Sequence, residues 1–339
     1  MPLILDRTRV LEVYAEARER KWVLPTFNAE NLTTAEAILQ AVKDYGTTVG
    51  SSDLPVIIGI TNTYRDRPQS VYYTHTRDWR TGLRLFLADL EVLASAGSPF
   101  SDLRVLIHLD HIIWDEDKEL LDWDMKQFSS IMYDASSLSF DSNMQQTAAF
   151  VEKHGHEILI EGACDAISKE HESDAGGLTT PDMAEQYFKE TGVDIIVPNL
   201  GTEHRASAST LCYHDDLARE ISLRTGPNLC LHGTSSVSKD KLTRLFEDGI
   251  CKVNMWTALE RDSSRVLLAR MLRNAASIAG PDLALQLRKE GLLGDKSDCE
   301  SLPSIDYYTT TFRQGIVFQC MKEIITGYLK LWYVSPYKK

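Results

Sequence analysis

The chain alternates short apolar runs with longer amphipathic segments eight times, and this alternation constrains its fold more than any other feature. The apolar runs, which we interpret as strands, are residues 22–27, 55–60, 104–108, 129–133, 157–161, 194–198, 228–232 and 250–254. Short, continuously apolar strands are typical of a parallel sheet that is covered by helices. Eight strand–helix units in roughly 260 residues predict an α/β fold of the (β/α)8, or TIM-barrel, type.

The segments between these strands predict helices. They are residues 6–20, 33–43, 81–95, 115–123, 140–154, 181–191, 214–224, 238–248 and a last one from the eighth strand to about 278. Residues 61–80 have no clear period and predict a long loop. A doubly wound open sheet is the alternative fold, but no Gly-x-Gly-x-x-Gly follows the first strand. We expect one barrel domain, residues 1–279, and a helical C-terminal extension, residues 280–339, that packs on the barrel or at an oligomer interface.

Composition excludes several classes of function. The formal net charge is -13 and the pI is near 5.2, which argues against nucleic-acid partners and against an anionic membrane surface. No apolar stretch reaches the ~18 residues of a membrane span, and the N-terminus lacks the apolar region of a signal peptide. The six cysteines show no disulfide framework. We therefore expect a cytoplasmic protein.

Ionisable and amide side chains gather where the predicted strands end. His108-Leu-Asp-His111 closes the third strand, Glu161 the fifth, His232 the seventh and Asn254 the eighth, and Gly201-Thr-Glu-His204 follows the sixth. We expect His108 and Asp110 to share one face of the third strand and His111 to begin the loop after it. The carboxyl ends of the strands carry the active site in this type of barrel. These residues are therefore expected to converge on one pocket.

Three histidines and a glutamate at this rim predict a zinc site with His111, His204, His232 and Glu161 as ligands. Zinc binds imidazole nitrogen and carboxylate oxygen, and a catalytic zinc site leaves one position open for substrate. A single histidine is more often a hydrogen-bonded structural residue. The joint placement of three histidines on strands three, six and seven favours the metal site.

The sequence resembles the class II, metal-dependent ketose-bisphosphate aldolases, which include fructose- and tagatose-bisphosphate enzymes. The resemblance covers roughly residues 20–275. The motifs that carry it are Pro25-Thr-Phe-Asn28, His108-Leu-Asp-His111, Phe128-Ser-Ser-Ile-Met-Tyr-Asp-Ala-Ser136, Gly201-Thr-Glu-His204, Leu231-His-Gly-Thr-Ser235 and Lys252-Val-Asn254. Their order and spacing match throughout, so the resemblance is more specific than any single motif.

The resemblance implies a carbon–carbon lyase of the aldehyde-lyase type. It would cleave a ketose phosphate reversibly into dihydroxyacetone phosphate and an aldehyde, through a zinc-stabilised enediolate. One catalytic Zn²⁺ is implied, with an additional monovalent cation allowed. The partner molecule would be a small sugar phosphate, and a homodimer or homotetramer is expected.

The resemblance also implies roles for individual residues. Asp110 matches the residue that shuttles the proton of the substrate hydroxyl, and Asn254 matches an asparagine that binds the donor. Gly233 and Ser235 match a phosphate-binding loop, although both also suit an ordinary turn. The remaining predicted substrate- or phosphate-binding residues are Asn28, Gly201, Arg205 and Thr257. Glu170 and Glu172 are the candidates for the catalytic acid of the loop after the fifth strand.

The sequence departs from the family pattern at several positions. Arg205 replaces a glycine, Thr234 replaces a glycine of the phosphate loop, and Trp256 replaces an acidic residue. Arg205 could bind a phosphate or carboxylate with two hydrogen bonds or block the phosphate position. These departures predict altered phosphate or acceptor specificity. The alternative is a non-catalytic barrel, descended from aldolases, that binds a metal or a sugar phosphate.

Overall fold

The structure, a computed structural model, describes residues 3–65, 67–165, 177–202 and 213–333 and confirms the predicted TIM barrel. Eight parallel strands follow one another around a closed barrel, and β8 pairs with β1. They are β1 (Leu24–Asn28), β2 (Pro55–Thr61), β3 (Arg104–Ile113), β4 (Ser130–Asp134), β5 (Leu159–Ala163), β6 (Ile195–Val197), β7 (Leu229–Leu231) and β8 (Ile250–Met255). All are almost wholly buried.

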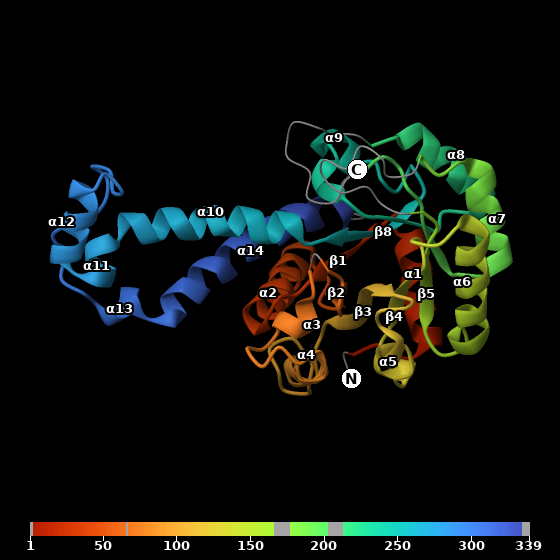
Figure 1. Ribbon diagram of the computed structural model, residues 1–339, viewed down its shortest axis with the longest axis horizontal. Helices are drawn as coiled ribbons and strands as arrows, with labels where there is room; N and C mark the ends of the chain where they lie inside the picture. Colours follow the sequence, from red (N-terminus) through yellow and green to blue (C-terminus); the bar gives the residue numbers. More distant parts are fainter. Residues whose placement is uncertain (1–2, 66, 166–176, 203–212, 334–339) are drawn as a thin grey trace.

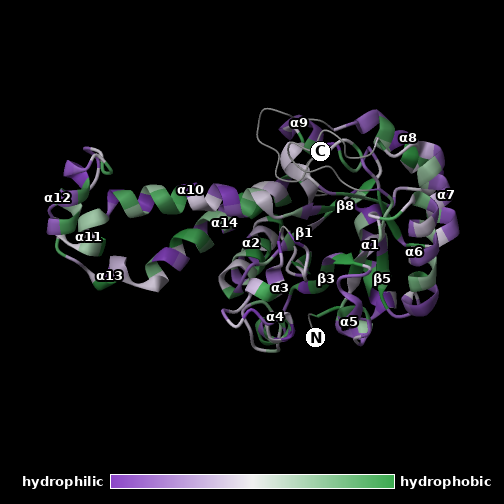
Figure 2. Ribbon diagram, in the orientation of Figure 1, coloured by the Kyte–Doolittle hydropathy of each residue, from purple (hydrophilic) through white to green (hydrophobic). Residues whose placement is uncertain are grey.

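Helices surround the barrel, as Figure 1 shows. They are α1 (Arg7–Glu19), α2 (Leu32–Val49), α3 (Gln69–Tyr72), α4 (Trp79–Leu93), α5 (Lys118–Leu121), α6 (Phe140–His154), α7 (Pro181–Thr191), α8 (Asp215–Thr225) and α9 (Lys239–Leu242), with the short 3-10 helices η1 (Met125–Gln127) and η2 (Thr234–Ser236). Apolar colours dominate the strands in Figure 2, while the surrounding helices are mixed. This pattern is expected for a sheet that is buried on both faces.

Several local predictions were wrong, and of the helix predicted over 238–248 only α9 forms. Residues 61–80 are not one loop, because they contain α3 and the start of α4, where the Asp78 carboxylate accepts a hydrogen bond from the Thr81 amide at 3.0 Å. The third strand continues to Ile113, so His111 belongs to β3 and not to the following loop. Glu161 lies in the middle of β5 and not at its end, because the strand spans Leu159–Ala163 where residues 157–161 were predicted.

The chain continues beyond β8 as a projecting helical extension, which lies on the left of Figure 1. It comprises α10 (Thr257–Arg273), α11 (Ala275–Ala279), α12 (Pro281–Lys289), α13 (Ile305–Tyr308) and α14 (Thr310–Trp332). α14 returns to the barrel and packs on α2 and α10. Its buried residues Met321, Ile325 and Leu329 recur every four positions, which places them on one helix face.

The far end of the extension has a small apolar cluster of its own, formed by Ala275, Ala276, Ala284, Leu293 and Cys299. This cluster joins residues on both sides of position 280, and the division into a barrel domain of residues 1–279 and an extension of residues 280–339 stays a prediction. No helix among the described residues is long and apolar enough to cross a membrane.

Candidate active site

A bulge in β3 directs two consecutive side chains toward the same pocket. Alternation along a regular strand would send Asp110 and His111 to opposite faces. The pairing of β3 with β4 shifts between Leu109 and Ile112, and His111 has a left-handed φ of 48°. A bulge of this kind re-aims a side chain. Asp110 and His111 consequently both lie beside His232, which follows β7.

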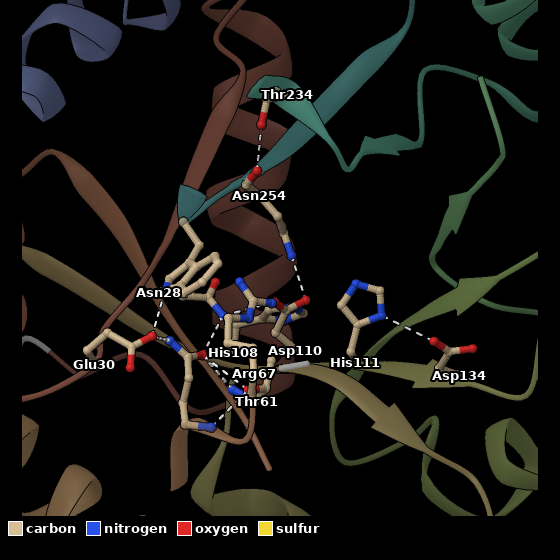
Figure 3. Close-up of polar contacts among 12 residues, drawn as sticks. Asn28, Glu30, Thr61, Arg67, His108, Asp110, His111, Asp134, Thr234 and Asn254 are labelled. Atoms are coloured by element: carbon tan, nitrogen blue, oxygen red, sulfur yellow. Dashed lines mark hydrogen bonds and ion pairs between the residues drawn. The ribbon is translucent and has the colours of Figure 1, made fainter. Parts of the chain in front are cut away.

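Three side chains donate hydrogen bonds to Asp110, which is fully buried. Asn254 Nδ2 lies 2.8 Å from Oδ1, and Asn28 Nδ2 and Arg67 Nη2 lie 2.9 and 2.6 Å from Oδ2. Figure 3 shows these donors converging on the carboxylate from different strands and one loop. Burial acts to raise the pKa of Asp110, but nearby His111 and Arg67 outweigh it and hold that pKa well below its ordinary value.

Two groups of donor atoms have the separation that a metal ion requires. Asp110, His111 and His232 form one group, and Glu161, Cys230 and His232 form the other. Within each group the ligand atoms lie within 4.8 Å of one another and every residue is buried. Imidazole, carboxylate and thiolate are all zinc ligands. The residues present therefore fit a zinc ion, with His232 common to both groups.

Asp134, at the end of β4, orients the His111 ring. His111 Nδ1 lies 3.1 Å from Asp134 Oδ2, and Ser136 donates two hydrogen bonds to the other carboxylate oxygen. Burial acts to raise the pKa of Asp134, but the His111 and Ser136 hydrogen bonds hold it below its ordinary value. The ionised carboxylate accepts a hydrogen bond from His111 Nδ1–H, which leaves the Nε2 lone pair as a metal donor.

Below this pocket, Lys252 is buried at the centre of the barrel with no exposed side-chain surface. Its Nζ lies 3.0 Å from Glu161 Oε1 and also donates to Asn254 Oδ1. Burial disfavours the charged amine, but Cys230 and Glu161 hold the pKa of Lys252 above its ordinary value. Glu161 remains a predicted metal ligand, and its carboxylate would have to serve both the lysine and the metal.

The turn after β7 leads through Gly233 into the short 3-10 helix η2. Gly233 has a φ of 64°, and Ser236 Oγ donates to its carbonyl at 2.7 Å. Thr234 Oγ1 donates to the Asn254 carbonyl at 2.7 Å, which ties this turn to β8. Ser235 is half-buried in the same turn, and Thr257 begins α10 three residues after Asn254. The hydrogen bond of Thr234 thus holds the turn that contains Gly233 and Ser235 next to Asn254, and the role of these residues in binding substrate stays a prediction.

Gly201 follows β6 with a φ of 79°, and its amide donates to Asn199 Oδ1 at 3.0 Å. A Cβ atom at this position would lie 2.6 Å from the His214 ring, so the backbone conformation and the packing both require glycine. The predicted ligand His204, the predicted anion-binding Arg205 and the candidate acids Glu170 and Glu172 lie outside the described residues.

The sequence analysis did not identify the side chains between β2 and α4 as part of the pocket. Gln69 is buried, accepts from Asn28 Nδ2 at 2.9 Å and donates to Glu30 Oε1 at 2.8 Å. Trp256 Nε1 donates to the same Glu30 oxygen. Arg67 and Gln69 had no identifiable pattern in the sequence, because their segment shows neither strand nor helix periodicity. Trp256, which replaces an acidic residue of the family pattern, was the one sequence feature that indicated a change in this part of the pocket.

Comparisons with known proteins agree with this geometry. Residues 8–292 match the model of the family described as fructose-bisphosphate aldolase class-II. The chain therefore belongs to the class II fructose-bisphosphate aldolase family and is a class II aldolase. A fructose-bisphosphate aldolase of Staphylococcus epidermidis is 26% identical over 297 residues, covering 86% of this chain and 94% of that protein. One from Giardia intestinalis is 27% identical over 284 residues, covering 75% and 79%.

Solved structures share the fold at low sequence identity. The fructose-bisphosphate aldolase of Campylobacter jejuni has a TM-score of 0.72 and 16% identity, covering 98% of this chain and 95% of its own. The YdjI aldolase of Escherichia coli K12 has a TM-score of 0.60 and 17% identity, covering 97% and 98%. These likenesses support the barrel and its C-terminal extension as one fold, because nearly the whole chain is covered.

Proposed function

We propose that this aldolase cleaves and re-forms a carbon–carbon bond of a ketose phosphate through an enediolate, with dihydroxyacetone phosphate as the donor and a zinc ion as the cofactor. The observation that carries the proposal is the buried pair of candidate ligands His111 and His232, whose donor atoms lie within 4.8 Å of each other and of a carboxylate oxygen of the proposed proton shuttle Asp110. The family is generally zinc-dependent. The alternative of a non-catalytic barrel is not favoured by the comparisons.

The metal would be held by His111 and His232, with His204 and Glu161 as the further predicted ligands. When bound, a zinc ion supplies Lewis-acid stabilisation of negative charge on the donor oxygens. Asp110 accepts the proton of the substrate hydroxyl when the carbon–carbon bond breaks, and it returns this proton during synthesis. Asn28, Asn254 and Arg67 fix the direction of its carboxylate. Glu170 or Glu172 would exchange the proton at the donor carbon.

The substrate-binding residues are proposed on the same basis. The turn of Gly233 and Ser235 offers backbone amides for the donor phosphate, and Gly201, Thr257 and Arg205 are further candidates. Asn254 would hold the donor, although its Nδ2 donates to Asp110 in this structure. Thr234 and Trp256 differ from the family pattern, so we propose an altered phosphate or acceptor specificity. A homodimer or homotetramer in the cytoplasm and an additional monovalent cation stay predictions.

The test is proton exchange on dihydroxyacetone phosphate in heavy water, followed by NMR with and without a chelator. The half-reaction needs the metal site and a base but no aldehyde, so the acceptor does not have to be known. Chelator-sensitive exchange is expected. Absence of exchange in protein that demonstrably contains zinc would reject dihydroxyacetone phosphate as the donor.

The Asp110→Ala variant separates proton transfer from metal binding. We expect it to lose cleavage of the ketose phosphate while a bound-metal measurement still finds zinc. Cleavage at the wild-type rate in this variant would show that Asp110 is not the proton shuttle.

A further inference from the structure

A small cavity lined in part by Arg67, the ion-pair partner of Asp110, has no role in the function proposed above. It has a volume of about 160 Å³ and is lined by Glu30, Arg67, Pro68, Gln69, Tyr72 and Trp256. These residues come from the loop after β1, the β2–α3 connection, α3 itself and the residue that precedes α10. Arg67 is the one cationic side chain among them. The cavity therefore joins the connection after β2 to the residue that precedes α10.

Arg67 is held firmly at the boundary between this cavity and Asp110. Its Nη2 lies 2.6 Å from Asp110 Oδ2, and its guanidinium carbon lies 5.0 Å from the centre of the Trp256 ring. The side chain is only 11% exposed. The ion pair and the aromatic contact together fix the plane of the guanidinium, so little conformational entropy remains to be lost when a ligand binds.

Most of the hydrogen-bonding capacity of Arg67 is unused. A guanidinium carries five N–H donors, and within the described parts of the chain only Nη2 donates, to Asp110. Nε and Nη1 are not among the fully buried atoms that lack a hydrogen-bond partner, and the Arg67 side chain lines the cavity. A planar, oriented guanidinium with free donors suits the paired oxygens of a phosphate or carboxylate.

The neighbouring carboxylate does not take up these donors. Glu30 Oε1 accepts hydrogen bonds from Gln69 Nε2 and Trp256 Nε1, which fix that carboxylate away from Arg67. Among the residues that the structure describes, Asp110 is the only acidic partner of Arg67 within salt-bridge distance. The remaining donors of the guanidinium are consequently available to an anion from outside the protein.

The position of Arg67 indicates which end of the substrate it would contact. β7 and β2 are separated by β8 and β1 around the barrel. In Figure 3, Thr234 and Arg67 lie on opposite sides of the pair formed by Asn254 and Asp110. A substrate whose reacting hydroxyl lies at Asp110 would therefore extend toward the turn of Gly233 and Ser235 at one end and toward Arg67 at the other.

We propose that Arg67 is a specificity-determining residue that binds an anionic group, a phosphate or a carboxylate, at the substrate end remote from the turn of Gly233 and Ser235. This inference rests on the proposed function, because Asp110 defines the position of the reacting hydroxyl. Arg67 keeps one N–H on Asp110 and offers its other donors to the anion. It thus orients the proton-transferring carboxylate and selects the substrate with the same side chain.

The experiment is calorimetric titration of the zinc-loaded protein with inorganic phosphate and, separately, with glycolate. Wild type is compared with Arg67→Met, Arg67→Lys and Arg65→Met. Arg65 is a matched control, because it lies in the same connection, is 86% exposed and has only a 3.6 Å ion pair with Glu116. Thermal unfolding verifies that each variant is folded, and the number of bound anions is fitted along with the Kd.

We expect Arg67→Met to weaken one bound anion at least 10-fold and Arg67→Lys to weaken it about 3-fold or more, because lysine keeps the charge but lacks the planar fork. Arg65→Met should change the Kd less than 2-fold. The anion that loses more affinity identifies the substrate group as a phosphate or a carboxylate. If wild type binds neither anion, or if both Arg67 variants bind as wild type does, the inference is overturned; Arg67→Lys decides if Arg67→Met does not fold.

Failure of this inference can be told apart from failure of the proposed function. Exchange on dihydroxyacetone phosphate together with unchanged anion binding in the Arg67 variants would reject the role of Arg67 alone. Loss of anion binding in those variants without any exchange in wild type would retain the anion site and reject the proposed donor.

Discussion

The charged side chains buried in this pocket depend on partner side chains that compensate for the loss of water. Lys252 and Glu161 form an ion pair with no exposed side-chain surface, and Asn254 accepts a hydrogen bond from the same lysine. Asn254 in turn donates to Asp110. Since a buried charge without a partner costs far more than the pair contributes, these side chains are expected to respond to mutation as a set.

Replacing Lys252 with methionine should therefore be strongly destabilising. Lys252→Met leaves Glu161 without its cationic partner in the barrel centre, and we expect a loss of about 3–5 kcal/mol in the free energy of unfolding. Denaturant unfolding of the metal-free protein measures this loss. The double variant Lys252→Met/Glu161→Gln should recover part of it. A double variant no more stable than Lys252→Met would show that the ion pair is not the cause.

Glu260 gives a prediction about pH. Burial, and then the charge of Glu30, raise the pKa of Glu260 to about 7 from an ordinary value of 4.5. A folded-state pKa above the unfolded value means that the native state binds the proton more tightly, so stability falls as pH rises from about 4.5 through about 7.

Glu260→Gln should remove this decline and raise the free energy of unfolding at pH 8 by on the order of 2 kcal/mol. Denaturant unfolding at pH 5 and pH 8 measures the difference between the variant and wild type, which should be small at pH 5. Glu30→Gln is the companion variant, because it removes the second cause of the shift while keeping an acceptor for Trp256. An equal gain for Glu260→Gln at both pH values would contradict the assignment.

At the scale of elements, the register between strands decides which side chains fit at the pocket. Gly59 on β2 pairs with Asn28 on β1. A Cβ atom at position 59 would lie 2.7 Å from Asn28 Oδ1 and 3.0 Å from Thr26 Cγ2. The absence of a side chain on β2 therefore makes the room in which Asn28 reaches Asp110.

Gly59→Ala should displace Asn28 and lower the exchange rate on dihydroxyacetone phosphate by about 10- to 100-fold, because small displacements of positioning groups are costly to catalysis. Gly315→Ala on α14 is the control, since nothing lies within 4 Å of its Cβ position. That control should keep its rate and gain up to about 1 kcal/mol in stability. A Gly59→Ala rate within 2-fold of wild type would argue against Asn28 as a positioning residue.

At the scale of the whole molecule, the C-terminal extension leaves the barrel and then returns to it. The end of α14 reaches the barrel core: Trp332 Nε1 donates to the Leu242 carbonyl at 3.0 Å, and Tyr333 donates to the Pro55 carbonyl. Tyr45 of α2 donates to the Tyr333 carbonyl. The last helix is therefore part of the barrel's packing, while α11, α12 and α13 lie at a distance from it (Figure 1).

Leu329→Ala should therefore destabilise the barrel by about 2–5 kcal/mol, because Leu329 is fully buried. Leu285→Ala on α12 is the matched control. Leu285 is 44% exposed, and we expect a change within about 0.5 kcal/mol. Denaturant unfolding followed by far-UV circular dichroism compares the two variants. Equal effects would show that α14 does not contribute to the barrel core.

The fold and the chemical residues of the rim were accessible from the sequence for a physical reason. Apolar runs mark the strands, and in a parallel barrel every carboxyl strand end lies at the same rim. Asp110, His111 and His232 each stand at or just after the end of such a run, so their position at one rim followed from strand order. The strand limits were less accurate, because hydrophobicity does not define where hydrogen bonding between strands begins and ends.

Tertiary structure alone decided how these residues act on one another. The left-handed φ of His111 and the bulge around it depend on pairing with β4 and have no counterpart in hydrophobic periodicity. The contacts of Arg67 with Asp110 and Trp256 join positions far apart in the chain and exist only because the barrel closes. The sequence by itself therefore determined which residues at the strand ends reach the rim. Closure of the barrel decided which of them form an ion pair or a hydrogen bond, or bind one ligand together.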